Sequence, residues 1–152
     1  MTTDAISAAD LNACFIKIEH GGEDVLFLLL ARDGSINRAG DGTPSPADQT
    51  LYIGVVKEPL FDQLMEVVPD ELFRYVGRLE LPDREGVDTT ISVMFQHHDG
   101  RVLPFEVLFG SESGNVPLEL QAILRRALEL SDVWWNDQRG RNESPVPRRP
   151  DI

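Results

Sequence analysis

The chain has 152 residues, a formal net charge of −12 and a hydrophobic fraction of 41%. This length is typical of one domain, and the apolar fraction is too high for a chain that is disordered throughout. The strong negative charge argues against binding to the phosphate backbone of nucleic acids, whereas it permits a basic protein partner.

The location of the protein is expected to be cytoplasmic. The single cysteine cannot form an intrachain disulfide, and the first residues carry no basic or apolar leader. The longest apolar run is far shorter than the roughly 20 residues that span a bilayer. We therefore expect neither secretion nor a membrane segment.

The first two predicted elements form a hairpin. Apolar and polar residues alternate from Cys14 onward, and Gly21-Gly22 fits a two-residue turn that would pair Ile16 with Phe27. Residues 25–30 are apolar at every position. We therefore expect the second strand to be central in a sheet and covered on both faces.

A long irregular stretch follows at 32–50, interrupted by a short predicted strand at 35–38. Loops of this length in compact domains are commonly functional or mobile. A strand is predicted again at 51–56, where Gly54 is expected to be a weak point or a bulge.

Two helices are predicted next. The first spans 59–68, where apolar residues recur at helical spacing, and the second is a short helix that Asp70 caps and Gly77 ends. A brief strand is expected at 79–81.

The clearest hairpin surrounds a predicted three-residue loop at 98–100. A two-residue loop would place the apolar residues of the two strands on opposite faces of the sheet, whereas a three-residue loop places them on the same face. We therefore predict that Phe95 pairs with Leu103 and that Gly100 adopts the left-handed conformation.

The last predicted element is a helix with Asn115 as its cap and Pro117 in its first turn. Its buried stripe is expected to contain Leu120, Ile123, Leu124, Ala127, Leu128 and Trp134. The composition changes after Trp135 to prolines and arginines.

These patterns predict an α+β fold with a mainly antiparallel sheet of five to six strands, built from β-hairpins, and two or three helices packed on it. The predicted order is β-β-(β)-β-α-α-(β)-β-β-α. We expect a mobile or loosely ordered segment at 1–12, a single domain at 13–136 and a disordered tail at 137–152.

The search for catalytic or metal-binding motifs favours a non-enzyme without a cofactor. His97 and His98 are neighbours in a predicted strand, so their side chains are expected to diverge rather than to share a metal ion. Cys14 is expected to be a buried structural thiol. The loop at 110–115 lacks the lysine of a phosphate-binding loop. We assign no catalytic and no metal-binding residue.

Two groups of residues remain as predicted binding sites. Asn37, Arg38, Asp41 and Ser113 would supply the polar groups of a ligand site between the loops at 33–43 and 110–116. For Arg38, the structural alternative is a contact with Asp33 or Asp41 that folds its own loop.

The adjacent pair Trp134 and Trp135 is a predicted partner-binding site, because tryptophan is enriched at the centres of interfaces. The alternative is packing of the helix against the sheet.

Three functional hypotheses follow. The first is a non-catalytic interaction module, an adaptor or an inhibitor of a basic protein. The second is a small-molecule-binding protein or an enzyme with its site between the two loops, and the third is a structural subunit of a homodimer.

Overall fold

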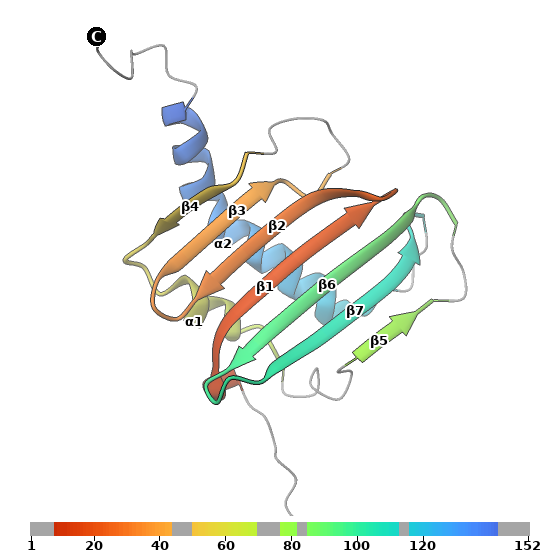
Figure 1. Cartoon of the computed structure of the whole chain (residues 1–152), viewed down its shortest axis with the longest axis horizontal. Helices are drawn as coiled ribbons and strands as arrows, with labels where there is room; N and C mark the ends of the chain where they lie inside the picture. Colours follow the sequence, from red (N-terminus) through yellow and green to blue (C-terminus); the bar gives the residue numbers. More distant parts are fainter. Residues whose placement is uncertain (1–7, 44–49, 70–76, 82–84, 113–115, 143–152) are drawn as a thin grey trace, which may run out of the picture.

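The computed structural model describes residues 8–43, 50–69, 77–81, 85–112 and 116–142. Its centre is a seven-stranded sheet with two helices on one side (Figure 1). In chain order the elements are the 3-10 turn η1 (Ala8–Asp10), β1 (Leu11–His20), β2 (Glu23–Ala31), β3 (Ser35–Gly40), β4 (Tyr52–Val55), α1 (Leu60–Met65), β5 (Gly77–Glu80), β6 (Asp88–His97), β7 (Val102–Gly110) and α2 (Leu118–Asn142).

The strand order in the sheet is β4-β3-β2-β1-β6-β7-β5. Five of the six pairings are antiparallel, and β5 runs parallel to β7. The prediction of an α+β fold with a mainly antiparallel sheet is confirmed. The sheet contains more strands than the five to six expected.

The first hairpin has the predicted Gly21-Gly22 turn, but its register differs from the prediction. A β-bulge between Ile18 and Glu19 shifts the pairing by one residue, so that Ile16 lies opposite Leu28 and not opposite Phe27. The shift places the even-numbered leucines of β2 on the same face as Cys14, Ile16 and Ile18 of β1. Burial of that face explains why the bulge is favoured.

The second hairpin has the predicted register. Phe95 pairs with Leu103, and Gly100 has a positive φ of 96°. The amide of Gly100 donates a hydrogen bond to the carbonyl of His97 at 2.9 Å, which closes the three-residue loop. The apolar residues of β6 and β7 therefore share the face that the helices cover.

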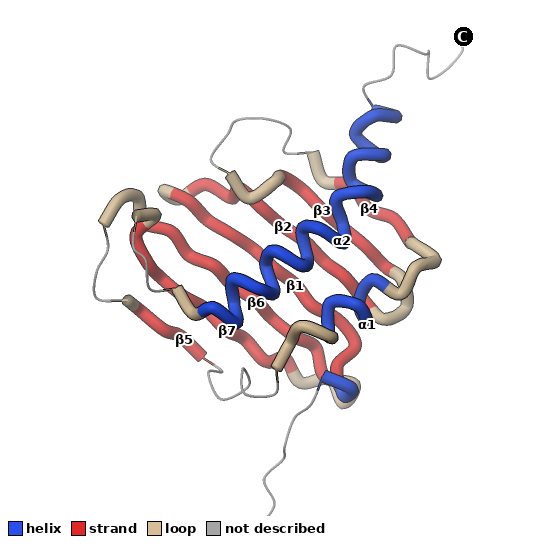
Figure 2. The backbone as a smooth tube through the Cα atoms, turned by 180° about the vertical axis from the view of Figure 1, so that it is seen from behind, coloured by secondary structure: helices blue, strands red, loops and turns tan. Residues whose placement is uncertain are grey.

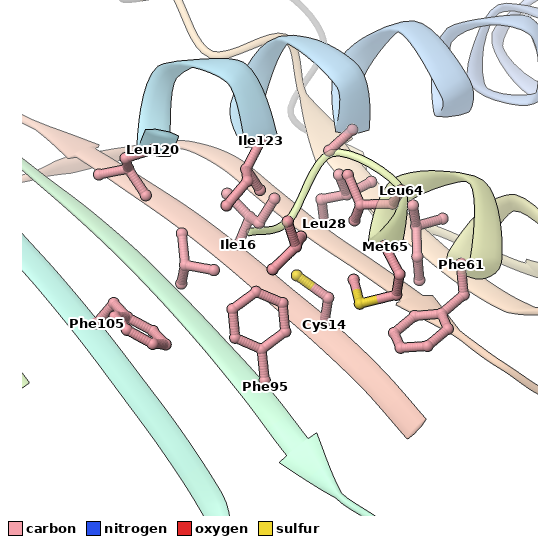
Figure 3. Packing of buried hydrophobic residues seen from close by; sticks show 14 of the residues in the cluster. Cys14, Ile16, Leu28, Phe61, Leu64, Met65, Phe95, Phe105, Leu120 and Ile123 are labelled. Atoms are coloured by element: carbon pink, nitrogen blue, oxygen red, sulfur yellow. The ribbon is translucent and has the colours of Figure 1, made fainter. Parts of the chain in front are cut away.

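The hydrophobic core lies between the sheet and the two helices (Figures 2 and 3). Figure 2 shows α2 crossing the sheet diagonally, with α1 beside it on the same face. Phe95 and Phe105 meet edge to face in this core, with their ring centroids 5.7 Å apart. The core also contains Cys14, Ile16, Leu28, Phe61, Leu64, Leu120 and Ile123.

Strand β2 is near the centre of the sheet, as expected, but helices cover only one of its faces. The prediction that both faces of β2 are covered is therefore wrong for the part of the chain that the structure describes. Its leucines at 26, 28 and 30 are buried, whereas Phe27 and Leu29 are half-buried on the opposite face and lie outside the core cluster.

Element boundaries depart from the prediction in several places. Strand β1 begins at Leu11, which is buried and lies inside the segment at 1–12 that we expect to be mobile or loosely ordered. Strand β5 spans Gly77–Glu80 and not 79–81. Residues 35–40 form β3, so the irregular stretch at 32–50 is shorter than expected. Helix α1 has only six residues. Helix α2 continues through residues 137–142, which we had placed in the tail. The second predicted helix, with its Asp70 cap, lies outside the described residues, as does Asn115.

Gly54 has a packing role that the sequence did not indicate. A β-carbon built at this glycine would lie 2.9 Å from Cζ2 of Trp134, so the indole of α2 lies directly on the backbone of β4. Gly54 therefore faces the helices, and its neighbours Ile53 and Val55 face the other way. Within the described residues, no helix is long and apolar enough to cross a membrane.

Candidate functional site: the open face of the sheet

One face of the sheet has no helix over it among the described residues, and we call it the open face (Figures 1 and 2). Successive strand residues point to opposite faces, so each neighbour of a core residue belongs to the open face. Antiparallel sheets with one solvated face normally carry polar residues there. This open face carries large apolar side chains in addition to polar ones.

A row of side chains crosses the open face on six neighbouring strands. From β4 to β7, strand pairing places the following residues side by side: Ile53, Asn37, Leu29, Phe15, Met94 and Pro104. Phe27 is two residues from Leu29 on the same face, opposite Ala39 and Lys17. Ile53 is 71% exposed and Pro104 is exposed, so the two ends of the row are open to solvent, and Met94 beside Pro104 is 38% exposed.

Charged groups lie beside the aromatic part of the row. Nζ of Lys17 lies 3.4 Å from a carboxylate oxygen of Glu19 and 3.5 Å from one of Asp24. Asp24, and then Glu19, raise the pKa of Lys17 above its ordinary value. On the neighbouring strands Glu106 lies opposite Ser92, which pairs with Lys17 on its other side. Three carboxylates thus border the apolar row, and Lys17 forms ion pairs with two of them.

Two shallow depressions mark the open face. The first is lined by Asp24, Leu26, Phe27, Ala39 and Leu51. The second lies over β6 and β7 and is lined by Ser92, Met94, Pro104 and Glu106, together with Gly77 and Phe105. Both combine apolar side chains with at least one carboxylate.

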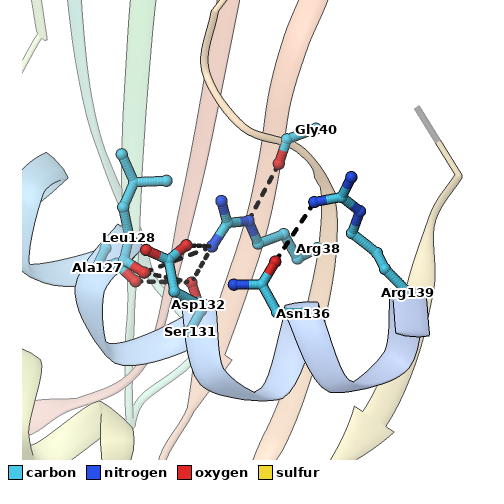
Figure 4. A network of polar contacts seen from close by, with 8 residues as sticks. All are labelled: Arg38, Gly40, Ala127, Leu128, Ser131, Asp132, Asn136 and Arg139. Carbon is cyan, nitrogen blue, oxygen red and sulfur yellow. Dashed lines mark hydrogen bonds and ion pairs between the residues drawn. The ribbon is translucent and has the colours of Figure 1, made fainter. Parts of the chain in front are cut away.

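Asn37 and Arg38, which we predicted as ligand-binding neighbours, point to opposite faces of β3. Asn37 lies in the row on the open face, opposite Leu29 and Ile53. The side chain of Arg38 is only 1% exposed and lies between the sheet and α2 (Figure 4). The structure therefore does not bring these two polar groups together.

Arg38 connects β3 to the last helix. Its Nη1 donates to Oδ1 of Asp132 at 2.7 Å and to Oγ of Ser131 at 2.9 Å, and its Nε donates to the carbonyl of Gly40 at 3.1 Å. The guanidinium also lies 3.9 Å from the ring centroid of Trp135. Burial lowers the pKa of Arg38, and the hydrogen bond and charge of Asp132 oppose this shift.

Asp41 binds its own loop. Its Oδ1 accepts hydrogen bonds from the amide and the hydroxyl of Thr43, at 2.9 and 2.7 Å. Partial burial acts to raise the pKa of Asp41, but the bonds from Thr43 outweigh it and the pKa lies below its ordinary value. Neither predicted alternative, Asp33 or Asp41, is the ion-pair partner of Arg38, because that partner is Asp132.

The two loops of the predicted ligand site begin on strands that are far apart. Strands β3 and β7 are separated by β2, β1 and β6, which makes four strand-to-strand steps of about 4.8 Å, or about 19 Å. Ser113 lies outside the described residues. The binding roles of Asn37, Arg38, Asp41 and Ser113 remain predictions.

Both tryptophans have packing roles. The indole of Trp134 lies on Gly54 of β4, and Trp135 is buried between two arginines, with Cζ of Arg38 at 3.9 Å and Cζ of Arg139 at 4.4 Å from its ring centroid. These contacts correspond to the alternative of packing between helix and sheet. A role of the pair in partner binding remains a prediction.

Cys14 is buried in the core on β1. Burial raises the pKa of its thiol far above its ordinary value, so the reactive thiolate is scarce at neutral pH. A buried structural thiol is what the sequence predicted.

His97 and His98 lie side by side, contrary to the expectation that they diverge. Their ring centroids are 4.3 Å apart, because β6 ends at His97 and His98 already belongs to the turn. Asp10 lies beside them, and one ligand atom from each of the three residues falls within 4.8 Å of the others. These are the residues that could hold a metal ion in the described part of the chain.

The open face was missed by reasoning from sequence, although a signal was present. Residues 25–30 are apolar at every position, and we interpreted this as cover on both faces. The same pattern is produced by a strand with a core on one side and an apolar open face on the other.

No protein-family model matches the chain, and no curated protein is significantly similar to it.

Proposed function

We propose that the protein is a non-catalytic binding module whose open face receives an apolar segment of a basic protein. The observation that carries the proposal is the row of side chains across six strands, all apolar except Asn37, with no helix over it among the described residues. Large exposed apolar patches with polar rims are typical of interaction sites.

The centre of the row supplies the affinity in this proposal. Phe15, Leu29 and Met94 are adjacent in register, and Phe27 adds a second aromatic ring two residues along β2. Aromatic and methionine side chains are enriched in the cores of interfaces. Each side chain that a partner covers fully contributes about 1.5–3 kcal/mol of transfer free energy.

Charge selects the kind of partner. The chain has a net charge of −12, and Glu19, Asp24 and Glu106 border the apolar row. A basic segment gains from this field both in encounter rate and in specificity. A second copy of the same chain brings an equal negative charge to the interface, so charge disfavours a homodimer.

The proposal is tested by selecting peptides from a phage-displayed random library on the full-length protein. We expect the enriched peptides to combine aromatic or aliphatic residues with lysine or arginine. Their Kd values are then measured by fluorescence polarisation against a variant with Ile53→Gln and Met94→Gln. These two substitutions reduce the apolar character of the open face, and we expect them to weaken binding about tenfold, or 1.4 kcal/mol.

The matched control carries Leu118→Gln and Val133→Gln. Both side chains belong to α2 and are 77% and 80% exposed, so the control removes exposed apolar surface away from the open face. It should bind the peptides as the wild-type chain does, and circular dichroism should show that both variants are folded. The proposal would be overturned if the selection enriched peptides without lysine or arginine. It would also be overturned if the peptides bound the open-face variant and the α2 control variant with equal Kd.

A further inference from the structure

Three residues with metal-binding side chains converge at the tip of the β6–β7 hairpin. Asp10 ends the turn that precedes β1, while His97 and His98 end β6 and begin the hairpin loop. One ligand atom from each residue lies within 4.8 Å of the other two. We propose that Asp10, His97 and His98 form a binding site for a divalent first-row transition-metal ion such as Zn²⁺.

The backbone brings the three residues together. The amide of His98 donates a hydrogen bond to the carbonyl of Asp10 at 2.9 Å, and the amide of His97 donates to the carbonyl of Arg101 at 2.8 Å. The pairing of β1 with β6 also changes register between Leu11 and Ala13, which places Leu11 opposite His97. Bulges commonly re-aim side chains next to functional sites.

His97 has the second contact that metal-binding histidines commonly make. Its Nδ1 lies 3.0 Å from Oδ1 of Asp99 and 3.2 Å from the backbone amide nitrogen of the same residue. The other carboxylate oxygen of Asp99 accepts from Nε of Arg101 at 2.7 Å. A carboxylate on one ring nitrogen orients the imidazole and makes the other nitrogen a better ligand. In the tautomer with its proton on Nδ1, this nitrogen donates to the carboxylate of Asp99, and Nε2 of His97 is the ligand atom in this proposal.

The ligand set and its exposure fit Zn²⁺. Two imidazoles and one carboxylate are typical of sites that hold zinc with water as the fourth ligand. Ligand atoms of a tetrahedral zinc site lie about 3.4 Å apart. The ligand atoms of the three residues lie within 4.8 Å of one another, so each distance between two of them needs to shorten by no more than about 1.4 Å. His97 is buried, whereas His98 is exposed, so its side chain can move and an ion can reach the site from solvent.

Zn²⁺ binding to the full-length protein is measured by competition with a chromophoric chelator. We expect one ion per chain and a Zn²⁺-dependent rise in Tm, because an ion that binds only the folded chain stabilises it. His98→Gln and Asp10→Asn remove ligands, and each should weaken binding by about tenfold or more. Co²⁺ should bind at the same site with the intense visible absorption of tetrahedral coordination.

His20→Gln is the matched control, because His20 is the third histidine and lies at the opposite end of β1. It should leave the Kd for Zn²⁺ unchanged. The proposal is overturned if the wild-type chain binds no Zn²⁺, if His98→Gln binds it unchanged, or if His20→Gln weakens it equally. His98 is exposed, so circular dichroism should show a folded His98→Gln variant in every case.

Discussion

Arg38 shows how a single residue can be recognised from sequence as unusual while its role depends on the tertiary structure. The sequence places this arginine among turn residues, and nearby aspartates were its expected partners. In the structure its ion-pair partner is Asp132, 94 positions away along the chain. The Arg38 guanidinium thereby connects β3 to α2, next to the buried ring of Trp135.

Replacing Arg38 with methionine should destabilise the protein by about 2–3 kcal/mol, because the hydrogen bonds to Ser131, Asp132 and Gly40 are lost while the apolar stem is kept. Urea unfolding measures the change. Asp132→Asn is the control: it removes the charge of a partly exposed partner but keeps an acceptor oxygen, so we expect about 1 kcal/mol. Equal losses from the two substitutions would contradict this account.

Asp41 should make a pH-dependent contribution to stability. Its pKa in the folded protein lies below the ordinary value of 3.8, so the contribution is complete above that value and is lost as the pH falls through the lower folded pKa. Asp41→Asn should therefore cost about 1 kcal/mol at neutral pH and less at about pH 3, below the ordinary pKa. Urea unfolding at both pH values checks this, and a cost independent of pH would contradict it.

At the scale of elements, the two main hairpins differ in how far their sequences determine them. Gly100 and the alternation on both sides of it were enough to predict the pairing of Phe95 with Leu103. The turn of the first hairpin was equally clear, but the bulge at Ile18 and Glu19 was not. With both faces of β2 apolar, the alternation could not indicate which face joins the core.

Strand β4 and helix α2 meet through Gly54. Because a β-carbon there would lie 2.9 Å from the Trp134 ring, Gly54→Ala should displace the indole and destabilise the protein by about 1–3 kcal/mol. Thermal unfolding monitored by tryptophan fluorescence measures the effect. Gly140→Ala is the control, since it meets no atom within 4 Å and improves helix propensity. A stability of Gly54→Ala equal to the wild type would rule out the close contact.

At the scale of the whole molecule, the apolar row on the open face and the large negative charge have opposite effects on association. The apolar row on the open face favours association, whereas a net charge of −12 keeps copies of the chain apart. In the proposed function, the balance between these two effects would keep the apolar surface available for a partner of opposite charge.

The balance should depend on salt. Sedimentation velocity should show a monomer at low ionic strength and weak self-association at about 1 M salt, where the Debye length falls to about 3 Å. Met94→Glu places a charge in the middle of the apolar row and should abolish the association at high salt. Self-association that weakens as salt is added would contradict the proposed role of charge.

The sequence by itself determined the α+β class, the mainly antiparallel sheet, the tip of the second hairpin and the burial of Cys14. These features follow from periodicity and turn chemistry, which act between residues close in the chain. Only the tertiary structure decided which face of β2 is covered, that Arg38 binds Asp132, and that Asp10 lies beside His97 and His98. Each of these depends on contacts between distant segments, because burial and strand pairing are settled only when the layers of the fold come together.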